Sequence, residues 1–262
     1  MSIKLIYFSI IKRISFIRSF MKKNTEVQSH GFIWERELCM NIYGATAEEL
    51  TEIKYTSKID LPSKFNRLDN CGISMKTSCS PNSVCMADCL RVYDAVSCGN
   101  PPNHLTVIHY TQNDETNTKH VTTITEIDIT NSTVALFGDL TRDELEGLDK
   151  LVKSVPQKRK PTVEEYTKMY ALRDALQRRC AAIHLDIKCN STQSRLQCSF
   201  NRFQQFLQDN PDRVIERSET TAFRGGSISS QILSSRRTFK KPMPPPPPPP
   251  PPQLSHVLSC SE

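Results

Sequence analysis

The chain has 262 residues, 37% of them hydrophobic and 24% charged, which suits one full domain with appendages or two small domains. Its formal net charge of +6 is unevenly distributed, with +6 in residues 1–23, −9 in residues 24–152 and +10 in residues 153–241. The sequence contains no glycine-rich phosphate loop, nucleophile elbow or HExxH run. Nothing in it therefore indicates a kinase, a hydrolase with a nucleophile elbow or a metalloprotease.

The ten cysteines do not follow the spacing of common zinc sites, and no CxxC knuckle pair is present. The densest group is Cys79, Cys85, Cys89 and Cys98. No credible secretory signal accompanies the even cysteine count, so we expect reduced, partly buried thiols in an intracellular protein of the cytoplasm or nucleus.

The first 20 residues alternate apolar and basic side chains. The apolar run is too short to span a bilayer and is interrupted by Lys12 and Arg13, so we expect no transmembrane segment. Three interpretations stay open: a basic amphipathic helix for a membrane surface, a partly ordered appendage, or an addition upstream of a natural start at Met21. We favour the last.

Two helices and a strand are predicted next. The helix over residues 29–43 ends at Gly44, and its apolar positions are Phe32, Trp34, Leu38 and Ile42. Thr46 and Glu49 form a capping box that begins a second short helix. Residues 53–60 are a candidate strand that ends at Asp60, because Pro62 follows closely.

Residues 73–77 have the period-2 pattern of a half-buried strand. Ser74 and Lys76 therefore share one face, and Ile73, Met75 and Thr77 share the other. A lysine on the polar face of a short strand, with an aspartate nearby, is what a metal-dependent nuclease needs. The carboxylate holds a hard cation, and the ammonium neutralises charge that develops on a phosphate.

The middle of the chain is predicted to alternate helices and strands. A helix is expected over residues 83–97 with Asn82 as its N-cap, and a strand over residues 105–110. Residues 120–129 and 133–137 are predicted to form a hairpin around an Asn-Ser turn.

The second half begins with two capping boxes, Thr141 with Glu144 and Thr162 with Glu165. They predict helices that end near residues 152 and 182. Two further strands follow at residues 183–189 and 195–200. An unbroken run of prolines at residues 244–252 is restricted to polyproline II, which either binds SH3- or WW-type grooves or is a low-complexity tail without a partner.

The order of these elements resembles the PD-(D/E)XK nuclease superfamily, the fold of many type II restriction endonucleases, over residues 29–112. The strand Ile73-Ser-Met-Lys-Thr77 followed by a helix carries most of the likeness. The whole chain also resembles uncharacterised proteins of large DNA viruses of algae and protists. The resemblance implies an α/β (α+β) fold, with a small mixed sheet flanked by helices and a helical and β-hairpin basic second half.

The resemblance also implies a site. The family's lysine falls on Lys76, and its first aspartate on Asp60 or Asp69, with a slight preference for Asp60. The second acid, two residues before the lysine, is Ser74 here, and a hydroxyl is a weak substitute for a carboxylate around Mg²⁺. Since this acid can migrate to the first helix in the family, Glu35 is its candidate replacement.

The basic second half is then the candidate surface for double-stranded DNA. Arg195 and Gln197 share one strand face and suit guanine and adenine in the major groove. Phosphate contacts are expected from Lys158, Arg159, Lys160, Arg178 and Arg179. Restriction enzymes of this kind usually act as homodimers, so a homodimer is implied by resemblance.

We therefore expect four regions: a basic extension at residues 1–23, an acidic nuclease-like core at residues 24–152, a basic recognition region at residues 153–237 and a polyproline tail at residues 238–262. The leading hypothesis is a Mg²⁺-dependent DNA endonuclease. The alternatives are a non-catalytic nucleic-acid-binding protein on a decayed nuclease fold, which the missing second acid favours, and an interaction scaffold that acts through its proline tract.

Overall fold

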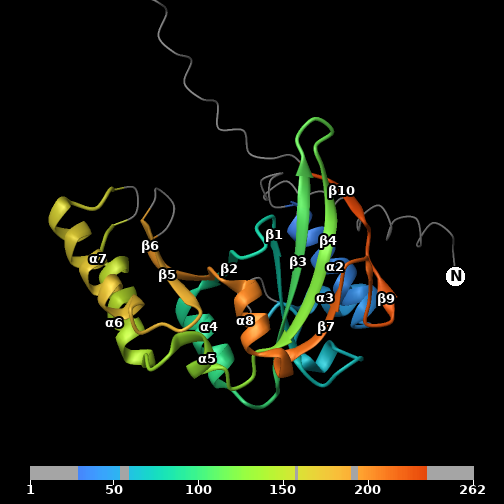
Figure 1. Cartoon of the computed structure of the whole chain (residues 1–262), viewed down its shortest axis with the longest axis horizontal. Coiled ribbons are helices and arrows are strands. Elements are labelled where there is room, and N and C mark those ends of the chain that lie inside the picture. Colours follow the sequence, from blue (N-terminus) through green and yellow to red (C-terminus); the bar gives the residue numbers. More distant parts are fainter. Residues whose placement is uncertain (1–28, 54–58, 157–158, 190–193, 235–262) are drawn as a thin grey trace, which may run out of the picture.

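The computed structural model describes residues 29–53, 59–156, 159–189 and 194–234 (Figure 1). The N-terminal extension, the proline tract, Lys158 and most of the strand predicted at residues 53–60 lie outside these ranges. Within them, the helices are too short or too polar for any to cross a bilayer.

A mixed sheet forms the centre of the molecule. Its strand order is β1 (Gly72–Ser78), β3 (Asn103–Asn113), β4 (Thr118–Asp128) and β10 (Gln231–Leu233), and β7 (Val214–Ser218) also pairs with β4. β1 and β3 are parallel, and the other pairs are antiparallel. The fold class is therefore mixed α/β with helices flanking a mixed sheet, as predicted.

One face of this sheet is covered by the N-terminal helices. α2 (Ser29–Glu37) continues into the π-helical turn η2 (Leu38–Ile42), and α3 (Ala47–Glu52) follows with the predicted Thr46 capping box. Trp34 and Leu38 are fully buried against the apolar side chains of β1, β3 and β4 on this face. The helix predicted over residues 29–43 is thus confirmed, and its last turn is π-helical instead of α-helical.

The other face of the sheet carries a second, three-stranded sheet and most of the helices (Figure 1). The second sheet has the order β2 (Val84–Asp88), β6 (Ser194–Phe200) and β5 (Ile183–Cys189). The helices are α4 (Cys89–Ser97), α5 (Thr133–Phe137), α6 (Arg142–Lys153), α7 (Val163–Gln177) and α8 (Phe203–Asp209). Leu105 and Val107 of β3 point into this core, while Ile108 points into the other, as strand alternation requires.

The helix predicted at residues 83–97 is wrong in its first part, where β2 forms. Val84 and Met86 are buried and Cys85 is exposed, because β2 alternates its side chains against β6. The helix begins only after Asp88, whose carboxylate accepts a hydrogen bond from the Arg91 backbone N–H at 3.0 Å. The predicted N-cap, Asn82, instead caps α8.

The predicted hairpin at residues 120–137 is also wrong in part. β4 confirms its first strand, but residues 133–137 form the short helix α5, and β4 pairs with β3 instead. Gly138 ends α5 at a φ of 66°, where a Cβ atom would collide with the Arg179 carbonyl oxygen. The α7 helix, predicted to reach residue 182, ends at Gln177.

The predicted boundary between residues 152 and 153 does not separate two structural units. β6 from the basic second half pairs with β2 from the acidic first half, and β7 and β10 pair with β4. Buried side chains from both halves share the same core. The second half is therefore part of the folding unit that holds the sheet, because it supplies two strands of that sheet.

Candidate functional site

Asp60 and Lys76 meet at the outer edge of β1. An isolated antiparallel bridge between Leu61 and Ile73 holds Asp60 beside this edge strand. Asp60 Oδ2 accepts hydrogen bonds from the Met75 backbone N–H at 2.7 Å and from Lys76 Nζ at 2.9 Å. The aspartate thus satisfies an edge-strand donor and pairs with the predicted catalytic lysine.

Glu35 approaches the same pair from helix α2. Burial is the main cause that raises the pKa of its carboxyl group to about 7, and the negative charge of Asp60 adds to this effect, whereas Lys76 opposes it. Because the charges of Asp60 and Lys76 both act on this carboxyl group, the three residues form one electrostatic cluster. We call Glu35, Asp60 and Lys76 the edge cluster.

The donors of the edge cluster suit a hard cation. Asp60 and Glu35 offer carboxylate oxygens, and the Met75 carbonyl, which accepts a hydrogen bond from Lys76 Nζ at 2.7 Å, offers a third oxygen nearby. Oxygen donors of this kind are those that Mg²⁺ prefers. Ser74 is half-buried on β1 and, by strand alternation, lies on the face opposite Ile73 and Met75.

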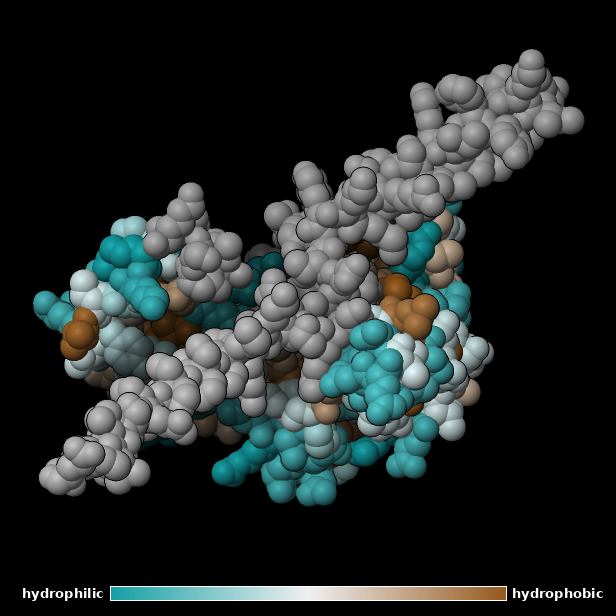
Figure 2. Space-filling model, turned by 90° about the horizontal axis from the view of Figure 1, so that it is seen from above, coloured by the Kyte–Doolittle hydropathy of each residue, from teal (hydrophilic) through white to brown (hydrophobic). Residues whose placement is uncertain are grey.

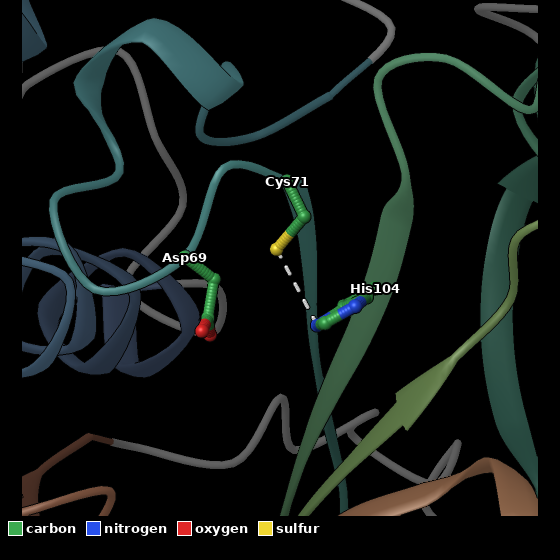
Figure 3. A group of neighbouring side chains, drawn as sticks. All are labelled: Asp69, Cys71 and His104. Carbon is green, nitrogen blue, oxygen red and sulfur yellow. Dashed lines mark hydrogen bonds between the residues drawn. The ribbon is translucent and has the colours of Figure 1, made fainter.

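Asp69, the alternative aspartate, belongs to a different group. Its carboxylate pairs with Arg224, and it lies with Cys71 and His104 at the start of β1 and β3 (Figure 3). The ligand atoms of Asp69, Cys71 and His104 all lie within 4.8 Å of one another. We call these three residues the Asp–Cys–His group. The choice left open by the sequence therefore falls on Asp60 as the partner of Lys76.

A buried glutamate connects the Asp–Cys–His group to the core. Glu126 on β4 is fully buried, and its carboxylate contacts His104 Nδ1 at 2.7 Å and accepts a hydrogen bond from the Tyr43 hydroxyl at 3.1 Å. Burial lowers the pKa of His104, but hydrogen bonds with Cys71 and Glu126 outweigh it, and the pKa rises to about 10.

Sequence reasoning missed the connection to Glu126. One signal was present, since Glu126 shares the period-2 face of the buried Ile124 on β4. An acid on a core-facing strand position needs a buried partner.

The residues predicted to read DNA bases lie in the second sheet. Gln197 is only 3% exposed, and its amide donates a hydrogen bond to Cys85 Sγ. Arg195 is half-buried and donates a hydrogen bond to Gln197 Oε1 at 3.2 Å. A side chain as buried as Gln197 does not reach a base edge in this arrangement, which argues against base reading by this pair.

The residues predicted to contact phosphates are exposed where the structure describes them. Arg159 pairs with Glu165 at 2.7 Å, and Arg179 pairs with Asp139 at 2.9 Å and with Glu144. Lys160 and Arg178 are exposed as well. Hydrophilic residues cover most of the visible surface of the part of the molecule that holds α6 and α7 (Figure 2).

Comparisons with known proteins do not assign the chain to a family. No protein-family model matches the chain, and neither the curated proteins nor the solved structures contain a match.

Proposed function

We propose that the protein is a Mg²⁺-dependent DNA endonuclease of the restriction type, which hydrolyses phosphodiester bonds. The observation that carries this proposal is the edge cluster, in which Glu35, Asp60 and Lys76 come from three separate segments to one edge of β1. The succession of β1, β2, α4 and the strand β3, which is parallel to β1, supports a restriction-endonuclease-like core around it.

The residues of the edge cluster have distinct roles in this proposal. Asp60 and Glu35 would hold Mg²⁺ through carboxylate oxygens, and the ion would supply the activation of water for attack on phosphorus. Lys76 neutralises the charge that develops on the phosphate, and Asp60 holds its ammonium group in place at 2.9 Å. Burial raises the pKa of Glu35, and only its carboxylate form binds a cation, so binding of Mg²⁺ would release a proton from this residue.

Affinity for double-stranded DNA would come from the basic second half rather than from the edge cluster. Residues 153–241 carry a formal charge of +10, and the exposed Lys160 and Arg178 are among them. Contacts of this kind release counterions from DNA, so binding weakens steeply with salt and carries no sequence choice. Binding as a homodimer to a symmetric site is part of the proposal.

A non-catalytic DNA-binding protein is the second candidate. The observation that favours it is Ser74, because a hydroxyl stands where a second strand carboxylate would strengthen the hold on a divalent cation. The two candidates share the basic surface and differ only in whether the edge cluster acts on the phosphodiester bond.

The wild-type protein distinguishes the two candidates when it is incubated with modified and unmodified viral and host DNA in the presence of Mg²⁺ or Mn²⁺. The proposal predicts discrete double-strand cuts in at least one unmodified DNA, no cuts in the presence of a chelator, and steeply salt-dependent binding in a gel-shift assay. Salt-dependent binding without cleavage of any of these substrates would exclude the enzyme and leave the binding protein.

A further inference from the structure

The Asp–Cys–His group lies where two parallel strands begin. Cys71 directly precedes β1, and His104 is the second residue of β3, where it stands opposite Ile73. The side chains of Asp69, Cys71 and His104 are directed into a common space (Figure 3). Cys71 is 2% exposed and the side chain of His104 is 11% exposed, so these two donors are largely shielded from water, whereas the side chain of Asp69 is 34% exposed.

The loop before β1 is fixed in the shape that this convergence requires. Asn66 is buried, and its side-chain oxygen accepts hydrogen bonds from the backbone N–H groups of Leu68 and Asp69 at 3.0 and 3.1 Å. Its side-chain nitrogen donates to the Cys71 carbonyl at 3.1 Å and to Cys71 Sγ at 3.4 Å. Asn66 thereby orients both Asp69 and Cys71, as outer-shell residues orient metal ligands.

The geometry does not match a cysteine–histidine catalytic relay. In such a relay the histidine contacts the thiol through one ring nitrogen and the acid through the other. Here, the same atom, His104 Nδ1, lies 3.4 Å from Cys71 Sγ and 2.7 Å from Glu126 Oε1. Several donors around one point indicate coordination rather than proton transfer.

The spacing and chemistry of the donors fit zinc. Zinc lies about 2.3 Å from a thiolate and about 2.0 Å from an imidazole nitrogen, so two such ligands at a tetrahedral angle are about 3.5 Å apart. The Sγ–Nδ1 separation of 3.4 Å is close to this value. One sulfur, one nitrogen and one carboxylate oxygen form a borderline-soft set that suits Zn²⁺ and not Mg²⁺.

The charges around the group also favour a further cation. When zinc binds, His104 is neutral and Cys71 is a thiolate. Asp69, Glu126 and the thiolate then carry three negative charges against the one guanidinium charge of Arg224, and a divalent cation balances the difference. Arg224 Nε lies 3.5 Å from Glu126 Oε2 and has no hydrogen-bond partner among the described residues. Arg224 alone therefore does not neutralise these buried groups, and buried charges require close pairing.

We infer that Asp69, Cys71 and His104 form a binding site for one Zn²⁺ ion, with Glu126, whose carboxylate contacts the same His104 nitrogen at 2.7 Å, as the fourth donor. Cys71 binds as the thiolate and His104 as the neutral imidazole, and each releases one proton to solvent when the ion binds. This site is separate from the edge cluster and does not depend on nuclease activity. It ties the loop before β1 to β3 and β4, so the ion stabilises the folded chain.

Titration with Co²⁺ tests the inference, because a cobalt–thiolate bond produces charge-transfer absorption in the near ultraviolet. We expect the full-length protein to show this absorption at one equivalent and to lose it when one equivalent of Zn²⁺ is added. Cys71→Ser should abolish the absorption, and Asp69→Asn should weaken cobalt binding at least ~10-fold while the absorption persists at saturation. Cys79→Ser, at an exposed cysteine, is the matched control and should behave as the wild type.

Two results would overturn the site: wild-type protein without thiolate–cobalt absorption, or absorption of full intensity in Cys71→Ser. Circular dichroism verifies that each variant is folded, and if Cys71→Ser does not fold, His104→Gln replaces it, with the same loss of the wild-type spectrum expected. Asp60→Asn should retain the cobalt spectrum in full, which separates this site from the edge cluster.

Discussion

Lys76→Ala is expected to lower the rate of metal-dependent DNA cleavage by ~100-fold or more. An effect of this size is typical when a group that stabilises charge in a transition state is removed. The affinity for DNA should stay nearly unchanged, because Lys76 acts on charge that develops in the reaction whereas affinity comes from the basic second half. Single-turnover cleavage and a gel-shift titration of the same preparation measure the two quantities.

Lys64→Ala is the matched control for this variant. Lys64 is a lysine of the same region whose side chain is 67% exposed and lies 3.9 Å from Glu52, so its loss should change neither cleavage nor affinity. Asp60 retains its hydrogen bond to the Met75 N–H when Lys76 is replaced, and the fold should therefore persist in thermal unfolding. Cleavage at the wild-type rate by folded Lys76→Ala would remove Lys76 from the mechanism.

Glu35→Gln is expected to change how stability depends on pH. The pKa of Glu35 is raised from 4.5 to about 7 in the folded protein, chiefly by burial. The folded state therefore holds a proton that the unfolded chain releases, and the wild-type free energy of unfolding falls as the pH rises from about 4.5 to about 7. Glutamine does not ionise. The free energy of unfolding of the variant, relative to that of the wild type, should therefore increase by on the order of 3 kcal/mol between pH 4 and pH 8.

Urea unfolding across this pH range, in the presence of a chelator, measures the difference between the two proteins. Glu52→Gln, at an exposed glutamate of α3, controls for the loss of one negative charge and should show no such change. A difference between wild type and Glu35→Gln that stays constant with pH would show that Glu35 does not approach Asp60 in a buried setting.

The local elements were predictable because short-range rules determine them, whereas the members of the edge cluster were expected from the resemblance to the nuclease superfamily. Strand β1 follows from the alternation around Ile73 and Met75, and the three capping boxes each begin a helix. The partnership of Asp60 with Lys76 required only that the chain before β1 run antiparallel along its edge.

The remaining features depend on contacts between distant segments. Residues 84–88 have a helix-compatible sequence, and they form a strand because β6, more than 100 residues later, pairs with them. The charge asymmetry suggested two separate regions, but contacts between distant segments join both of them in one core.

The Asp–Cys–His group is likewise created by tertiary structure. Its members meet because β1 and β3 are parallel and in register at Ile73 and His104. Arg224 reaches Asp69 from a turn between β8 (Ala222–Phe223) and β9 (Gly226–Ser227), where Arg224 and Gly225 both have positive φ angles. No spacing within the sequence indicates either contact.

Anomalous X-ray scattering from bound Mn²⁺ tests whether the edge cluster binds a metal ion, because Mn²⁺ takes the oxygen ligands of Mg²⁺. In crystals grown with Mn²⁺, we expect an anomalous peak coordinated by the carboxylates of Asp60 and Glu35, and no such peak in Asp60→Asn. An ordered Asp60 that still pairs with Lys76 at saturating Mn²⁺, with no peak beside it, would contradict metal binding by the edge cluster, as would a peak that is confined to the Asp–Cys–His group.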